Sequence, residues 1–119
     1  MPDKLKLINL DYLNEISEGN VDFIIDLFDM FYKQIPEYQI SLLDLYDKKD
    51  WINLGKLAHK AKSAILMVGM KELADDLKKM EENAKEGINI NEYHEIIVKF
   101  VRDSNLAIEE LKEVRKNYN

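Results

Sequence analysis

Glycine and proline, which most often interrupt helices, are scarce in this chain: its 119 residues include four Gly and two Pro. The segments between them are long, and their apolar residues recur at three- and four-residue spacing, the pattern of amphipathic helices. The sequence therefore predicts an all-α protein. Short connections between long helices favour antiparallel neighbours, so we expect an up-and-down four-helix bundle with a short N-terminal helix laid across it. The length fits one domain over residues 1–119.

The first two expected helices differ in length. A short helix is expected over residues 10–16, with Asn9 as its N-cap. A long one follows from Val21, and its apolar stripe reaches Leu45. Pro36 falls inside that stripe and predicts a kink or brief break, because proline removes a backbone donor and clashes with the preceding turn. The stripe comprises Ile24, Leu27, Phe28, Phe31, Ile35, Tyr38, Leu42 and Leu45.

Three further helices are expected after Asp50. Asp50 caps the third helix and Gly69 ends it, while Gly87 ends the fourth. Asn89 with Glu92 three residues later predicts a capping box for the last helix. The stripe of the third helix is Leu54, Leu57, Ala58, Ala61, Ile65 and Val68. That of the fourth is Leu73, Leu77, Met80 and Ala84. That of the last is Tyr93, Ile96, Ile97, Phe100, Ser104, Ala107, Leu111 and Val114.

Composition excludes several classes of protein. Without cysteine the chain can have no disulfide bond, thiolate nucleophile or CxxC metal site. No apolar run approaches the roughly 18 residues of a membrane span, and residues 1–10 lack the basic-then-apolar order of a signal peptide, so we expect a cytoplasmic protein. The net charge of −6 has the wrong sign for binding nucleic acid through its phosphate groups.

The outer face of the third helix is unusual. On a helical wheel His59 lies roughly 140° from the centre of the buried seam near Leu54, so we expect it to be exposed. Small residues beside it, bordered by aliphatic ones, favour close approach by another protein. The alternative is that the two aliphatic residues, Ile52 and Leu66, pack under the N-terminal helix. The residues placed on this face are Ile52, Gly55, Ser63 and Leu66.

Residues 51–71 contain no acidic side chain, although the whole chain is acidic. Lys62 projects to the same side as His59, three residues earlier, and the positive charge favours an anion beside the imidazole. The alternative is that these are ordinary solubilising lysines. The lysines of this strip are Lys56, Lys60, Lys62 and Lys71.

The segment Ala58-His59-Lys60-Ala61-Lys62-Ser63-Ala64, followed by Gly69, resembles the AHxLKG pattern and later glycine of histidine phosphotransfer (HPt) domains. Phe31 and Pro36 upstream, and Leu73, Leu77, Glu81 and Lys85 downstream, extend the resemblance over essentially the whole chain. Three positions depart from the family pattern. Ala61 replaces a leucine, Ser63 replaces a glycine, and Lys85 stands where an arginine is often found.

The resemblance implies a phosphocarrier in a two-component phosphorelay, a form of signal transduction. His59 would accept a phosphoryl group from the phospho-aspartate of a receiver domain and pass it to another receiver. Lys62 and Lys85 would compensate its charge, and Glu81 would orient the ring. The partner receivers, which belong to a hybrid histidine kinase and a response regulator, would dock on Ile52, Gly55, Lys56, Ser63 and Leu66.

The same resemblance implies that the catalytic magnesium ion belongs to the receiver, so we expect no cofactor or metal on this chain. Nothing in the sequence resembles an ATP site, and we expect no kinase activity of its own, no membrane or nucleic-acid partner, and a monomer. The chief alternative is a helical adaptor that docks a receiver or a partner helix without phosphoryl chemistry. Glu81 with Lys85 also has a simpler interpretation as an i,i+4 helix pair. His94 is expected to be a surface residue without a role.

Overall fold

The computed structural model describes residues 7–118, and every regular element within that range is helical. Residues 1–6 and 119 of the expected domain lie outside the described residues. In order, the elements are α1 (Asp11–Ser17), α2 (Val21–Asp47), α3 (Trp51–Met67), α4 (Lys71–Glu86), η1 (Ile90–Glu92), α5 (Tyr93–Arg115) and η2 (Lys116–Tyr118). None of the helices within residues 7–118 is long and apolar enough to cross a membrane.

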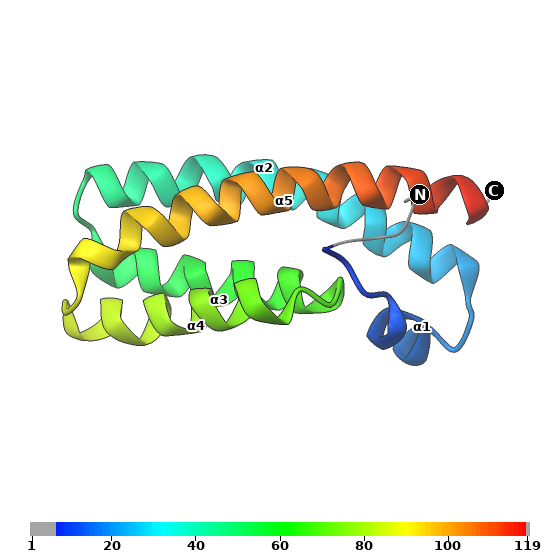
Figure 1. Ribbon diagram of the computed structural model, residues 1–119, viewed down its shortest axis with the longest axis horizontal. Coiled ribbons are helices and arrows are strands. Elements are labelled where there is room, and N and C mark those ends of the chain that lie inside the picture. Colours follow the sequence, from blue (N-terminus) through cyan, green and yellow to red (C-terminus); the bar gives the residue numbers. More distant parts are fainter. Residues whose placement is uncertain (1–6, 119) are drawn as a thin grey trace.

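The four long helices lie alongside one another, and each runs opposite in direction to the one before it (Figure 1). The most extensive pairing joins α3 to α4, while α2 packs on both α3 and α5. The short helix α1 lies near the turn between α3 and α4, at the end of the molecule where α2 begins (Figure 1). The antiparallel order follows from the short connections, which leave each long helix beside its neighbour in sequence.

The predicted apolar stripes form the core. In α2 the buried positions are Ile24, Phe28, Phe31, Ile35 and Leu42, and in α5 they are Tyr93, Ile97, Phe100, Ser104, Ala107 and Leu111. The stripe positions left partly exposed, such as Leu27 and Val114, still pack against the core. Ser104 is the polar member of its stripe, and its hydroxyl accepts a hydrogen bond from Gln39 Nε2 at 2.8 Å, which satisfies the oxygen at the core's edge.

Helix α2 passes through Pro36 as one uninterrupted α-helix, so a break at this residue is wrong. Pro36 is exposed, and its ring therefore displaces no core side chain. In Figure 1 the first part of α2, drawn in light blue, is inclined to the remainder.

Local chemistry changes two of the predicted helix ends. Helix α1 begins one residue later than expected, so its N-cap is Leu10 and the prediction of Asn9 at that position is wrong. Asn9 Oδ1 nevertheless accepts a hydrogen bond from the Asp11 N–H at 2.9 Å. The capping box at Asn89 is wrong, because Asn89 has a left-handed backbone (φ 56°) and its side chain caps no N–H. An N-cap residue needs an extended backbone to present its side chain to the first turn. Here Asn89 opens the short turn η1 instead.

The segment before α1 is fixed to the α3–α4 turn. The Asn9 N–H donates to the Val68 carbonyl at 2.8 Å, and the Glu110 carboxylate accepts from the N–H groups of Leu7 and Ile8. Gly69 makes the first of these contacts possible, because a Cβ there would lie 2.2 Å from the Asn9 oxygen. These bonds place α1 beside the C-terminal end of α3.

Candidate functional site

His59 lies on the outer side of α3, with 58% of its side chain exposed. Its Nδ1 atom lies 3.1 Å from Oε2 of Glu81, which comes from the neighbouring helix α4. A carboxylate at this distance accepts a hydrogen bond from Nδ1–H, and this favours the tautomer whose Nε2 carries a free lone pair. The exposed imidazole is thereby oriented with its nucleophilic nitrogen available.

The Glu81 carboxylate also lies near two lysines. Lys62 Nζ is 3.5 Å from Oε1, and Lys85 Nζ is 3.9 Å from Oε2. The Glu81 side chain is only 12% exposed, so burial removes much of its hydration and these cationic partners offset that cost. All four predicted chemical residues, His59, Lys62, Glu81 and Lys85, are thus brought together. The i,i+4 ion pair of Glu81 with Lys85 is present as well.

Gly55 is not on the exposed face where the wheel places it. The structure buries it against α4, where an added Cβ would lie 3.3 Å from the Glu81 carbonyl oxygen and 3.4 Å from the Ala84 Cβ. The wheel is wrong here because α4 approaches α3 so closely that the buried arc extends beyond the Leu54 seam. Gly55 is therefore a helix-packing residue, and a docking partner cannot reach it.

The other predicted docking residues remain on the surface. Ile52 and Lys56 are exposed near the start of α3, at the opposite end from α1, so Ile52 does not pack under that helix. Ser63 is exposed one turn after His59, and its hydroxyl donates to the His59 carbonyl at 3.2 Å. Leu66 is 42% exposed and borders a hollow beneath α1.

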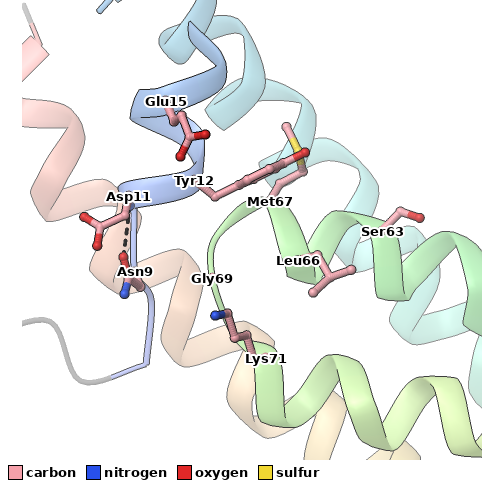
Figure 2. A pocket seen from close by; sticks show the side chains of 9 residues that line it. All are labelled: Asn9, Asp11, Tyr12, Glu15, Ser63, Leu66, Met67, Gly69 and Lys71. Atoms are coloured by element: carbon pink, nitrogen blue, oxygen red, sulfur yellow. Dashed lines mark hydrogen bonds between the residues drawn. The ribbon is translucent and has the colours of Figure 1, made fainter. Parts of the chain in front are cut away.

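This hollow between α1 and α3 has a volume of about 670 Å³. Figure 2 shows the ring of Tyr12 reaching from α1 toward Met67 of α3. Carboxylates of Asp11 and Glu15 lie on the α1 edge, while Lys71 lies at the start of α4. Sequence reasoning missed Tyr12 and Met67 as lining residues, since their proximity depends on the bonds that hold α1 in place. Their apolar character was the only local signal.

Outside this region, His94 is exposed on α5 and its ring lies 5.4 Å from that of Tyr46. Within residues 7–118, no cluster of three or more His, Cys, Asp or Glu side chains is arranged to hold a metal ion.

The chain matches no model of a known protein family, no curated protein and no solved structure.

Proposed function

We propose that the protein is a histidine phosphotransfer domain that carries a phosphoryl group on Nε2 of His59 between receiver domains of a two-component phosphorelay. The observation that carries this proposal is the contact between His59 Nδ1 and the Glu81 carboxylate at 3.1 Å, on an otherwise exposed imidazole. A ring used only for solubility or docking has no need for a buried carboxylate behind it. The resemblance of residues 58–64 to the HPt pattern supports the same function.

The proposed reaction has two transfers. The Nε2 lone pair attacks the phosphorus of a receiver phospho-aspartate, so a P–N bond forms while the P–O bond to the aspartate breaks and its carboxylate leaves. The phosphorylated ring keeps its proton on Nδ1, and the negative Glu81 carboxylate stabilises the resulting positive charge. In the second transfer an aspartate oxygen of another receiver attacks phosphorus, and neutral imidazole leaves. The catalytic magnesium ion is supplied by the receiver.

Lys62 and Lys85 compensate the charge of the transferred group in this proposal. Phosphoryl transfer depends mainly on positioning and charge stabilisation, because its transition state is loose. Lys62 lies one helical turn beyond His59, and its ammonium group is held at 3.5 Å from Glu81 in the unphosphorylated protein. A phosphoryl group on Nε2 offers it a second anion nearby.

A receiver domain would dock over His59, along a surface formed by Ile52, Lys56, Ser63 and Leu66. The hollow beneath α1 continues this surface beyond Leu66 and offers apolar contact area beside the reactive ring. We also propose that α2 to α5 form an up-and-down four-helix bundle, bent at Pro36, and that the protein is a cytoplasmic monomer. It is a carrier without ATP-dependent kinase activity, cofactor or nucleic-acid partner of its own.

A helical adaptor that docks a receiver without phosphoryl chemistry is the second candidate. The observation that favours it is the hollow itself, because an apolar depression of this volume serves docking whether or not transfer follows. The two candidates differ in what His59 contributes.

The deciding experiment incubates the protein with magnesium and a panel of receiver domains carrying labelled phospho-aspartate. We expect acid-labile, base-stable label on the wild-type chain and none on His59→Gln. His94→Gln is the matched control, since it removes the other histidine of the chain, which is also exposed, and it should label normally. Label on His59→Gln would refute the assignment. Binding of a receiver without any label on the wild type would establish the adaptor.

A further inference from the structure

We infer that Gly55 is a positioning residue for His59: its missing side chain sets the spacing between α3 and α4 at which Glu81 reaches the imidazole. Gly55 is one of the buried residues of α3. The nearest atoms to a Cβ at this residue would be the Glu81 carbonyl oxygen at 3.3 Å and the Ala84 Cβ at 3.4 Å. The distance to the Glu81 carbonyl oxygen is tighter than nearly all Cβ contacts in proteins, and the distance to the Ala84 Cβ is at the lower limit of ordinary van der Waals contact, so α4 would have to yield by a few tenths of an ångström at Glu81.

Helix geometry links Gly55 to the imidazole. Side chains lean toward the N-terminus of their own helix. The helices α3 and α4 run in opposite directions (Figure 1). The Glu81 side chain should therefore lean from the level of Gly55, where its carbonyl oxygen lies, toward the C-terminus of α3. One turn in that direction lies His59, and the carboxylate meets its Nδ1 at 3.1 Å. The backbone of Glu81 is thus anchored at Gly55, while its carboxylate acts one turn farther on.

The hydrogen bond between His59 Nδ1 and Glu81 Oε2 is close to the upper limit of length. N–H···O hydrogen bonds in proteins fall between about 2.7 and 3.2 Å, so a displacement of α4 by a few tenths of an ångström takes the 3.1 Å separation to the end of that range. A glycine inside a helix also costs stability relative to alanine. Its presence at a buried helical position requires a compensating benefit, and close approach at the Glu81 backbone supplies one.

A purely structural role for Gly55 makes a different prediction. If the residue only improved packing, its replacement would change stability and leave the state of the His59 ring alone. The inference therefore needs a readout of the ring itself. Nitrogen NMR of the imidazoles provides it, because the chain has only two histidines and His94 serves as an internal reference.

The test compares Gly55→Ala and Gly55→Leu with the wild type. In Gly55→Ala we expect a Tm at or above that of the wild type, together with a shift of the His59 nitrogen signals away from the Nδ1–H tautomer. In Gly55→Leu the shift should be larger, and the His94 signals should stay unchanged in both. Folded variants with wild-type His59 signals would overturn the inference.

Ala84 offers a matched control on the opposite helix. Ala84→Gly should lower the Tm but preserve the His59 tautomer, since it creates space rather than removing it. Combined with Gly55→Ala, it should shift the His59 signals part of the way back toward those of the wild type, because it removes the Ala84 Cβ from the atoms that the new Cβ meets, while the closer Glu81 carbonyl oxygen remains. A double variant with the same signals as Gly55→Ala would overturn the part of the inference that rests on the Ala84 contact.

The consequence for transfer rests on the proposed function. If His59 carries phosphoryl groups, the rate of transfer from a receiver should fall about tenfold in Gly55→Ala, which corresponds to weakening one hydrogen bond to a charged group. A wild-type chain that takes no label would remove the phosphotransfer function, yet the NMR result for Gly55 would stand. Normal transfer in Gly55→Ala with shifted ring signals would overturn the link between spacing and rate alone.

Discussion

Among single residues, Glu81 connects the parts of the site. Its carboxylate joins the imidazole of α3 to lysines on both α3 and α4, and it does so while largely withdrawn from water. The spacing of His59 and Lys62 on one helix could be predicted from sequence, because both follow from helical periodicity. The contact of Glu81 with His59 could not follow from spacing, since it crosses between helices. Only the family resemblance indicated it.

If His59 carries phosphoryl groups as proposed, removing the Glu81 carboxylate should slow their transfer. In Glu81→Ala, His59 loses its acceptor at 3.1 Å, and a hydrogen bond to a charged group contributes about 1.5–3 kcal/mol, so single-turnover transfer should slow by about tenfold to a hundredfold. Glu81→Gln keeps an oxygen acceptor and should lose less. Glu82→Gln, at the exposed neighbouring position, is the control. Wild-type rates in Glu81→Ala would contradict a role for the carboxylate.

At the scale of elements, the helices could be predicted more securely than their ends. Apolar periodicity identified the interiors of α2 to α5 because the same stripe recurs over many turns. The ends depend on one or two backbone angles, and the apolar pattern did not predict the left-handed backbone conformation of Asn89. The prediction that Gly55 is exposed failed for a related reason. A helical wheel gives directions around one helix, but it carries no information on how closely the next helix approaches.

Replacing Pro36 should stabilise α2. Proline has no N–H to donate to the carbonyl of Tyr32 one turn earlier, although the helix continues through it. Pro36→Ala restores that donor at an exposed position, and we expect the free energy of unfolding to rise by about 1–3 kcal/mol in urea denaturation. Glu37→Ala, next to it and also exposed, should change it by less than about 0.5 kcal/mol. A loss of stability in Pro36→Ala would mean that core packing requires the proline.

For the whole molecule, the all-helical class followed from scarce turn residues, but the position of α1 did not. That position depends on bonds between residues very distant in sequence, such as the Leu7 N–H and the Glu110 carboxylate. No local pattern predicts such a pair. The hollow beneath α1 is a product of this placement, which is why its lining could not be predicted from the sequence.

Alkaline conditions should destabilise the whole fold. Burial raises the pKa of Tyr93 above its usual 10.0, with Glu92 adding to the effect, and burial likewise raises the pKa values of Tyr32 and Tyr38. A raised pKa means that the folded state holds the proton more tightly. Its contribution is therefore complete below about pH 10 and is lost as the pH rises through the folded-state pKa. The free energy of unfolding, measured in urea from about pH 8 to 11, should fall above about pH 10.

Tyr93→Phe isolates one of these groups. The variant loses the hydrogen bond that the Tyr93 hydroxyl donates to the Ile88 carbonyl, so it should be about 1 kcal/mol less stable at neutral pH. It should also decline less steeply above pH 10. Tyr12→Phe, at an exposed tyrosine, is the control and should keep the wild-type slope. An unchanged slope in Tyr93→Phe would exclude Tyr93 from the alkaline transition.

The contact between Gly69 and Asn9 also limits which amino acids the fold accepts at position 69 when that codon is randomised. Glu18, Lys49 and Asn89 all carry side chains at φ values of 52–58°, so a left-handed backbone does not by itself demand glycine in this chain. At Gly69, however, even the smallest side chain would meet the Asn9 carbonyl at 2.2 Å and displace the segment that holds α1. Selection for an intact fold should therefore recover glycine alone at codon 69. The codons for Glu18, Lys49 and Asn89 should tolerate several different amino acids.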